Sequence, residues 1–196
     1  MKKLSFLLKR VIDRFMAAAM IVALLPVFII LILTQFIFIG SPIFFVSTRV
    51  GYKKTTFKML KFRSMTNAKD ANGHFLPDEE RLISYGRFIR KTSLDEVPQI
   101  FNVLIGNMSW IGPRAVPQGH LDFIKNEHEK RFDMLPGISG WTQVNYKGKK
   151  RTWEEKLALD IEYIENFNLL FDLKIVLMTI TVLFTRLRYN KSGSSL

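Results

Sequence analysis

The apolar residues of this chain are concentrated at its N-terminus. Residues 15–39 read FMAAAMIVALLPVFIILILTQFIFI, and no charged residue lies between Arg14 and Arg49. About 20 apolar residues are enough to cross a bilayer, and a run this apolar favours a membrane helix over a buried core helix. The run is also longer than the apolar part of a secretory signal peptide. We therefore expect residues 1–40 to form a membrane element.

Two features of this element favour a helix that enters the membrane and returns on the same side. Pro26 stands near its middle, where proline removes a backbone hydrogen bond and kinks a helix. Basic residues flank both ends, and the positive-inside rule assigns both flanks to the cytoplasm. The sequence alone leaves a simple span open as the alternative. The flanking residues are Lys2, Lys3, Lys9, Arg10 and Arg14 before the run, and Arg49, Lys53 and Lys54 after it.

A second apolar segment, LLFDLKIVLMTITVLFTRL, occupies residues 169–187. Its uncharged core, residues 175–185, is too short to span a bilayer. Two interpretations remain open: an amphipathic helix at the membrane interface, with Asp172, Lys174, Arg186 and Arg188 at the surface, or a core helix. We expect residues 189–196 to be a flexible tail.

The residues that follow the N-terminal element predict a small α+β domain, residues 41–188, that is mostly helical. Residues 43–50 and 55–62 are β-prone and flank a turn, which predicts a β-hairpin. Residues 66–80 are rich in turn formers and predict a loop. We expect helices over residues 79–91 and 127–134, a turn over 136–140, and a helix that starts with a capping box at Thr152 and ends near Asn166.

Charge and composition limit the classes of molecule that this protein can bind. The formal net charge is +12 and the pI is about 10.0, which indicates anionic partners. No nucleic-acid motif is present, and the aromatic residues follow apolar runs, so we expect no nucleic acid. The chain has no cysteine, which excludes disulfides and thiolate metal sites. Its histidines, His74, His120 and His128, are scattered, and we interpret them as surface residues.

The stretch KTSLDEVPQIFNVLIGNMSWIGPR, residues 91–114, places Asp95 and Glu96 beside an apolar run. Ser93 or Asp95 is a good N-cap and Pro98 fits the first turn, so we expect both carboxylates at a helix N-terminus. The helix dipole alone favours acidic residues there. A structural role is therefore the simplest interpretation.

The cations around the acidic pair add a functional interpretation. We expect Lys61, Arg63, Arg90 and Arg114 to lie near it and to bind phosphates. Mg²⁺ is often held by one or two carboxylates together with substrate phosphates. A carboxylate pair, several cations and a membrane element together indicate a metal-assisted reaction on a lipid-linked phosphate.

Four segments make the chain resemble the bacterial sugar transferase family, the monotopic phosphoglycosyl transferases. They are KFRSM (residues 61–65), SLDEVPQIFNVLIGNMSWIGPR (93–114), LPGISGWTQVN (135–145) and WEEKLALDIEYIENFNLLFDLKIV (153–176). The resemblance covers nearly the whole chain, and the short length suggests a bare catalytic unit. It implies a re-entrant membrane helix and interfacial helices at the cytoplasmic face of the bacterial inner (plasma) membrane, among its lipids.

The resemblance also implies a reaction. Such enzymes move a sugar-1-phosphate from a UDP-sugar to polyprenyl (undecaprenyl) phosphate, release UMP, require Mg²⁺ and pass through a phosphosugar ester of the aspartate. By resemblance, Asp95 is the nucleophile and also contacts Mg²⁺, and Glu96 positions the metal or manages protons. Lys61, Arg90 and Arg114 then hold phosphates. The sequence assigns no role to Asp160, and it leaves the sugar and a homodimer open.

Two positions depart from the family pattern. Ala115 follows the GPR motif where a proline is common, and residues 145–148 read NYKG where NGRN is common. The second change puts nucleotide or sugar contacts from that loop in doubt. Three alternatives therefore stay open: a membrane-anchored basic binding protein, a glycosyltransferase that releases UDP, and an inactive relative.

Overall fold

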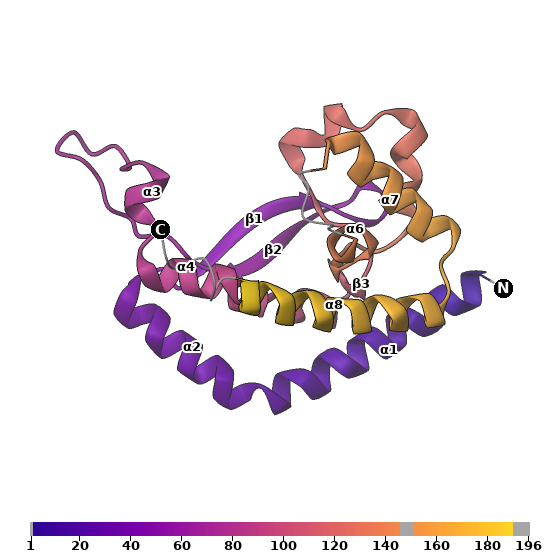
Figure 1. The fold of residues 1–196 in the computed structure, drawn as a ribbon, viewed down its shortest axis with the longest axis horizontal. Coiled ribbons are helices and arrows are strands. Elements are labelled where there is room, and N and C mark those ends of the chain that lie inside the picture. The colour runs from indigo at the N-terminus through magenta and orange to yellow at the C-terminus, as the bar shows by residue number, and fades with distance from the viewer. Residues whose placement is uncertain (1, 146–150, 190–196) are drawn as a thin grey trace.

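The computed structural model describes residues 2–145 and 151–189, and it has the predicted α+β architecture with helices predominating (Figure 1). The helices are α1 (Lys2–Ala23), α2 (Leu25–Phe38), α3 (Asp78–Arg81), α4 (Ser84–Lys91), α5 (Gln99–Ile105), α6 (Trp141–Val144), α7 (Trp153–Glu165) and α8 (Leu169–Tyr189). The strands are β1 (Phe44–Val50), β2 (Thr56–Phe62), β3 (Ser109–Ile111), β4 (Val116–Pro117) and β5 (Gly137–Ser139). Short 3₁₀ segments occupy Tyr52–Lys54, Leu94–Glu96, Gln118–Phe123 and Asn126–Asp133.

The N-terminal apolar run is broken where proline predicts a break. Helices α1 and α2 meet at Leu24 with a bend of 66°, and Pro26 lies in the first turn of α2. A helix tolerates proline at that position because its first amides have no intrahelical partner. Among the described residues no single helix is long and apolar enough to cross a membrane, but the bent pair meets the criterion jointly. The two helices form the arms of a shallow V along one side of the molecule (Figure 1).

Buried ion pairs and a hydrogen bond connect α1 to α8 and β3. Lys9, Asp13 and Ala17, spaced four residues apart, share one buried face. The Lys9 ammonium lies 2.6 Å from Asp172 on α8 and 3.7 Å from Asp13. The hydroxyl of Ser109 donates to Asp13 at 2.6 Å. Asp172 is therefore not at the surface, as the interfacial interpretation of this segment has it, because its carboxylate is buried as the partner of Lys9.

The opposite faces of these helices are apolar and exposed. Leu4, Phe15 and Val22 on α1 and Ile37 on α2 each expose more than 70% of their surface. Helix α8 is two-sided in the same way: Ile175 is completely buried, whereas Leu170 is 79% exposed. Each of the two interpretations of residues 169–187 thus describes one face of α8. Many large apolar side chains exposed on the faces of these helices indicate contact with a membrane or a partner.

The predicted hairpin is confirmed. β1 and β2 pair antiparallel with Phe44 opposite Phe62 and Val50 opposite Thr56. The short strand β4 adds to the other edge of β1, where Val116 lies opposite Val50. The GPR motif, residues 112–114, precedes β4. The pairing of β4 with β1 therefore places the motif near the C-terminal end of β1.

The expected turn over residues 136–140 is instead strand β5, which pairs parallel with β3. A Cβ atom on Gly137 would lie 2.2 Å from the Gly112 nitrogen, so the two backbones approach too closely for any side chain. The glycines that suggest a turn in the sequence therefore serve a tight backbone pairing.

Two predicted helices differ from expectation. The single helix over residues 79–91 is split into α3 and α4, because Leu82 and Ile83 leave helical geometry. The split lets α4 pack against Ser64, whose carbonyl oxygen would lie 1.9 Å from a Cβ on Gly86. The expected helix over 127–134 is the 3₁₀ segment Asn126–Asp133. The capping box at Thr152, the helix that ends near Asn166 and the loop over most of 66–80 are confirmed.

Candidate active site

The acidic pair lies in a tight turn between two helices. Asp95 and Glu96 belong to the 3₁₀ segment Leu94–Glu96, and α5 begins only at Gln99, with Pro98 at its N-cap. Ser93 has a left-handed backbone (φ 58°) and makes no capping hydrogen bond through its side chain. The pair therefore lies at a helix N-terminus with Ser93 at the N-cap position, as expected, but the helix is a single 3₁₀ turn and not α5. Proline lacks an amide hydrogen, so it starts α5 after the pair.

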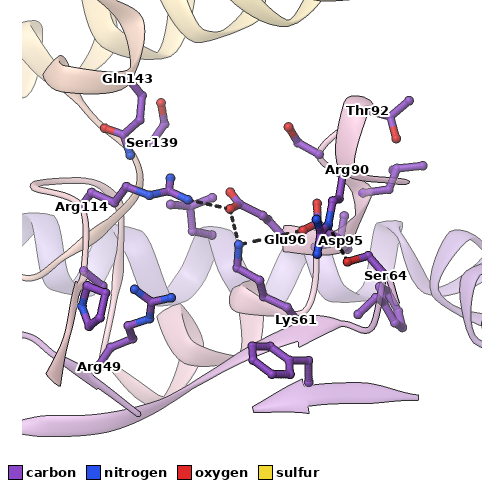
Figure 2. A pocket seen from close by; sticks show the side chains of 18 of the residues that line it. Arg49, Lys61, Ser64, Arg90, Thr92, Asp95, Glu96, Arg114, Ser139 and Gln143 are labelled. Atoms are coloured by element: carbon purple, nitrogen blue, oxygen red, sulfur yellow. Dashed lines mark hydrogen bonds and ion pairs between the residues drawn. The ribbon is translucent and has the colours of Figure 1, made fainter. Parts of the chain in front are cut away.

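Two cations from different elements hold Glu96. The Lys61 Nζ atom, on β2, lies 2.6 Å from Glu96 Oε1. The guanidinium of Arg114, which precedes β4, donates to the same oxygen at 3.0 Å (Figure 2). Burial alone would raise the pKa of Glu96, but Arg114 and Lys61 outweigh it and hold that pKa below its ordinary value. Glu96 is consequently a fixed anion.

Asp95 has a different environment although it is the next residue. Its nearest cation, Lys61, lies 3.9 Å from Oδ2. Its side chain is only 13% exposed. Burial raises the pKa of Asp95; the charge of Lys61 opposes this, and neighbouring Glu96 adds to it. Asp95 is therefore the more basic carboxylate and the less tightly bound one.

A third cation approaches from α4. The Arg90 Nε atom donates to the hydroxyl of Ser64 at 2.6 Å (Figure 2). Its positive charge lowers the pKa of Asp95 by a smaller amount. Arg63 lines the same cavity, but its guanidinium donates to the Pro42 carbonyl oxygen at 3.2 Å. Of the four cations that the sequence proposes for phosphates, the structure brings Lys61, Arg90 and Arg114 around the acidic pair and ties Arg63 to backbone.

These groups open into one cavity of about 1390 Å³. The hairpin, the acidic turn, α6, α7 and α8 all contribute to its lining. The described part of the chain contains no group of three or more His, Cys, Asp or Glu side chains arranged to hold a metal ion. A cation at this site would therefore need further ligands from a substrate.

A buried ion pair supports the Arg114 side of the cavity. The Arg131 guanidinium donates to Asp160 at 2.6 Å and to the Arg114 carbonyl oxygen at 2.8 Å. Thr142 donates to the other Asp160 oxygen at 2.6 Å. Burial raises the pKa of Asp160, and Arg131 opposes the increase. The network links α7 to the GPR motif, which gives Asp160 the structural setting that the sequence does not reveal.

The sequence analysis treats Arg49 only as a basic flank of the membrane run and does not place it in the site. Arg49 lines the cavity near the C-terminal end of β1, below Arg114 in Figure 2. The signal was available in the strand alternation: Phe45 pairs with Lys61, and Arg49 lies four residues after Phe45, so the three share one face of the hairpin. The departure at residues 145–148 lies outside the described residues except for Asn145.

The sequence of this chain is similar to those of known bacterial proteins. A model of the bacterial sugar transferase family matches residues 4–186. An uncharacterized sugar transferase of Bacillus subtilis, EpsL, is 43% identical over 72% of this chain and 70% of its own length. The chain belongs to the bacterial sugar transferase family, which confirms the resemblance.

Two further relatives carry more specific names. A UDP-glucose:undecaprenyl-phosphate glucose-1-phosphate transferase of Caulobacter vibrioides is 35% identical over 90% of this chain and 70% of its own length. A UDP-N-acetylgalactosamine-undecaprenyl-phosphate N-acetylgalactosaminephosphotransferase of Aeromonas hydrophila is 39% identical over 74% of this chain. The chain spans 36% of the length of the Aeromonas protein, and 37% and 39% of two other relatives.

Proposed function

We propose that this protein transfers a sugar-1-phosphate from a UDP-sugar to a polyprenyl phosphate, such as undecaprenyl phosphate, with release of UMP. The names of the relatives supply the reaction class. The observation that carries the proposal is the unequal treatment of the acidic pair: Glu96 is held by two cations, whereas Asp95 is buried and only distantly paired. An enzyme that uses one carboxylate as a nucleophile and the other as a support needs this difference.

In the first step, an Asp95 carboxylate oxygen attacks the β-phosphorus of the UDP-sugar. The bond from that phosphorus to the bridging oxygen breaks, and UMP leaves with the bridging oxygen and its electron pair. The sugar phosphate stays on Asp95 as an acyl phosphate ester. A raised pKa makes a carboxylate more nucleophilic while it remains ionised, and a covalent intermediate divides one difficult displacement into two.

In the second step, a phosphate oxygen of the polyprenyl phosphate attacks the same phosphorus. The bond to Asp95 breaks and the carboxylate is restored, so the product is a polyprenyl diphosphate sugar. Lys61, Arg90 and Arg114 offset the negative charge that two phosphates and a carboxylate bring together. Glu96, fixed by its two cations, keeps Lys61 and Arg114 oriented toward the cavity.

The donor set around Asp95 fits Mg²⁺ in the way that magnesium-dependent phosphoryl transfer generally uses it. No other side chain of the described residues donates a hydrogen bond to the Asp95 carboxylate, and Glu96 is its neighbour. Magnesium often takes one or two protein carboxylates and completes its shell with phosphate oxygens and water. Asp95, with Glu96 beside it, would hold the ion, which would neutralise charge on the diphosphate.

We further propose that the site works at the cytoplasmic face of the bacterial inner membrane. The exposed apolar faces of α1, α2 and α8 support this placement. The bent pair α1 and α2 would dip into the bilayer and return, as the basic flanks predict. A polyprenyl phosphate then presents its phosphate to the cavity while its chain stays in lipid.

The experiment that tests the proposal is nucleotide release by the full chain in lipid nanodiscs. The assay supplies Mg²⁺, a panel of UDP-sugars, and polyprenyl phosphate in one arm only. Asp95→Asn is compared with wild type, and Asp122→Asn, an exposed aspartate outside the cavity, is the matched control.

The expected result is UMP release that requires the lipid for turnover, is lost in Asp95→Asn and persists in Asp122→Asn. The sugar that supports release identifies the donor. Release of UDP would show that the sugar–phosphate bond breaks instead, which contradicts the proposed reaction. Full activity of Asp95→Asn would contradict the proposed nucleophile.

A further inference from the structure

Two arginines, Arg49 and Arg114, line the Glu96 end of the cavity. Arg114 donates to Glu96 at 3.0 Å. Arg49 forms no ion pair with any carboxylate of the described residues, and its Nε atom donates only to the Ser47 hydroxyl at 3.3 Å. Burial, and then the charge of Arg114, lower the pKa of Arg49. Both guanidiniums line the cavity (Figure 2).

This arrangement leaves positive charge unbalanced. Glu96 already accepts from Lys61 as well as Arg114, so one carboxylate faces three cations. Like-charged guanidiniums repel one another unless an anion lies near both, and Arg49, unlike the exposed Arg114, is partly buried. The planar fork of arginine matches the oxygens of a phosphate, and such charge-assisted pairs are the strong hydrogen bonds of proteins. This end of the cavity therefore favours an anion with several acceptor oxygens.

An unpartnered amide lies next to this cationic end. Both polar atoms of the Gln143 side chain are buried and have no hydrogen-bond partner. Its Oε1 atom lies 2.8 Å from the point where a Cβ of Gly140 would be, and the Gly112 carbonyl oxygen lies 2.1 Å from that same point. Gly112 is two residues before Arg114. Gln143 borders the same cavity and is drawn beside Arg114 in Figure 2.

The chemistry of this amide indicates its ligand. A buried donor or acceptor without a partner costs roughly 1–3 kcal/mol, and such groups are rare enough in proteins to need an explanation. A side-chain amide offers one acceptor and one donor in a plane. The uracil ring offers the complement along one edge, an N3–H donor beside the O4 acceptor.

We propose that this end of the cavity is the nucleotide subsite, in which Arg49 and Arg114 bind the UMP phosphate and Gln143 pairs with the uracil. The inference rests on the proposed function and adds two residues, Arg49 and Gln143, to it. It also orients the substrate: UMP leaves toward the Glu96 side, and the sugar extends toward Arg90 and Ser64.

In-line displacement implies that the same subsite also binds the phosphate of the polyprenyl phosphate. The leaving and attacking oxygens of a phosphoryl transfer lie roughly opposite one another. UMP departs opposite Asp95, so the lipid phosphate that later displaces Asp95 must approach from the same side. Arg49 therefore binds the phosphate of both UMP and the polyprenyl phosphate, whereas Gln143 contacts only the nucleotide.

The test measures inhibition constants of UMP and of ribose 5-phosphate, which has the phosphate without the base, on the full chain in lipid nanodiscs. Direct calorimetric titration of UMP accompanies it. Arg49→Gln and Gln143→Ala are compared with wild type. Arg87→Gln, on the exposed face of α4, and Gln118→Ala are the matched controls, since neither residue lines the cavity. Arg49→Lys keeps a charge without the fork, and melting temperatures report whether each variant folds.

Arg49→Gln is expected to weaken UMP and ribose 5-phosphate alike by about tenfold or more, since a hydrogen bond to a charged group contributes roughly 1.5–3 kcal/mol. It should raise the KM for polyprenyl phosphate as well. Arg49→Lys should fall between Arg49→Gln and wild type. Gln143→Ala should weaken UMP by about tenfold, leave ribose 5-phosphate unchanged, and leave the KM for the lipid unchanged.

Wild-type UMP affinity in folded Arg49→Gln would overturn the phosphate assignment, and an unchanged preference for UMP over ribose 5-phosphate in Gln143→Ala would overturn the base assignment. A wild-type protein that does not bind UMP would overturn both. Failure of the proposed function looks different. If UMP binding depends on Arg49 and Gln143 but the enzyme releases UDP, the subsite stands and the phosphosugar transfer does not.

Discussion

The ammonium group of Lys61 lies 2.6 Å from a carboxylate oxygen of Glu96 but 3.9 Å from one of Asp95. One lysine thus gives two adjacent and chemically similar carboxylates different electrostatic environments. Arg114 enlarges the difference by bonding the same Glu96 oxygen. The pKa of Glu96 falls and that of Asp95 rises, so the turn carries one fixed anion and one more basic carboxylate.

Replacing Lys61 should therefore damage catalysis more than its charge alone suggests. Lys61→Gln leaves Glu96 with only Arg114, and we expect kcat to fall roughly tenfold to a hundredfold, the equivalent of one charge-assisted hydrogen bond. Lys58→Gln on the same strand is the control, because its ammonium bonds Thr48 and stays outside the cavity. Equal rates for the two variants would contradict this role.

The acid limb of the pH–rate profile should report Asp95. Its pKa is raised, so it becomes protonated and unreactive at a higher pH than an ordinary aspartate as the pH falls. Lys61 opposes that shift, so Lys61→Gln should move the acid limb to still higher pH. Single-turnover UMP release measured across the acid range checks both statements. An acid limb that moves to lower pH in Lys61→Gln would contradict the proposed effect of Lys61 on the pKa of Asp95.

Local signals in the sequence predict local structure well here. The alternation around Gly51 predicts the hairpin, the Thr152 and Glu155 pair predicts the start of α7, and Pro26 predicts the break in the apolar run. Each depends on residues within a few positions of one another. The resemblance, which covers nearly the whole chain, identifies the family before the structure does.

What the sequence does not predict depends on contacts between distant segments. Strand β5 is only Gly137–Ser139, and its partner β3 ends 26 residues earlier at Ile111, so its glycines resemble a turn. Asp172 resembles a surface residue until Lys9, 163 positions away, is placed beside it. Arg49 enters the candidate site through strand register, which local pattern leaves open.

The Arg131 and Asp160 pair should be a determinant of stability. Asp160→Asn leaves the buried Arg131 guanidinium without its counter-ion, and removing one partner of a buried pair costs about 3–5 kcal/mol. The exposed pair of Lys130 and Glu165 provides the control: Glu165→Gln should cost below about 1 kcal/mol. Thermal unfolding of the two variants measures the difference. A melting temperature of Asp160→Asn equal to that of Glu165→Gln would refute the assignment.

The buried bond between α1 and α8 should couple the two helices. Lys9→Met leaves the carboxylates of Asp13 and Asp172 without a shared cation, so we expect a strongly lowered melting temperature. Asp172→Asn in the same chain should recover part of the loss, because one unpaired charge is removed. A double-mutant cycle measures the coupling. Additive losses would mean that the two side chains act independently.

The central claim is that Asp95, and not Glu96, becomes covalently attached to the sugar phosphate. Intact-protein mass spectrometry after mixing with the UDP-sugar and Mg²⁺, without lipid, tests it directly. We predict an added sugar-phosphate mass on wild type and on Glu96→Gln, none on Asp95→Asn, and loss of the mass when polyprenyl phosphate is added. An adduct that persists in Asp95→Asn, or one that the lipid does not discharge, would contradict the mechanism.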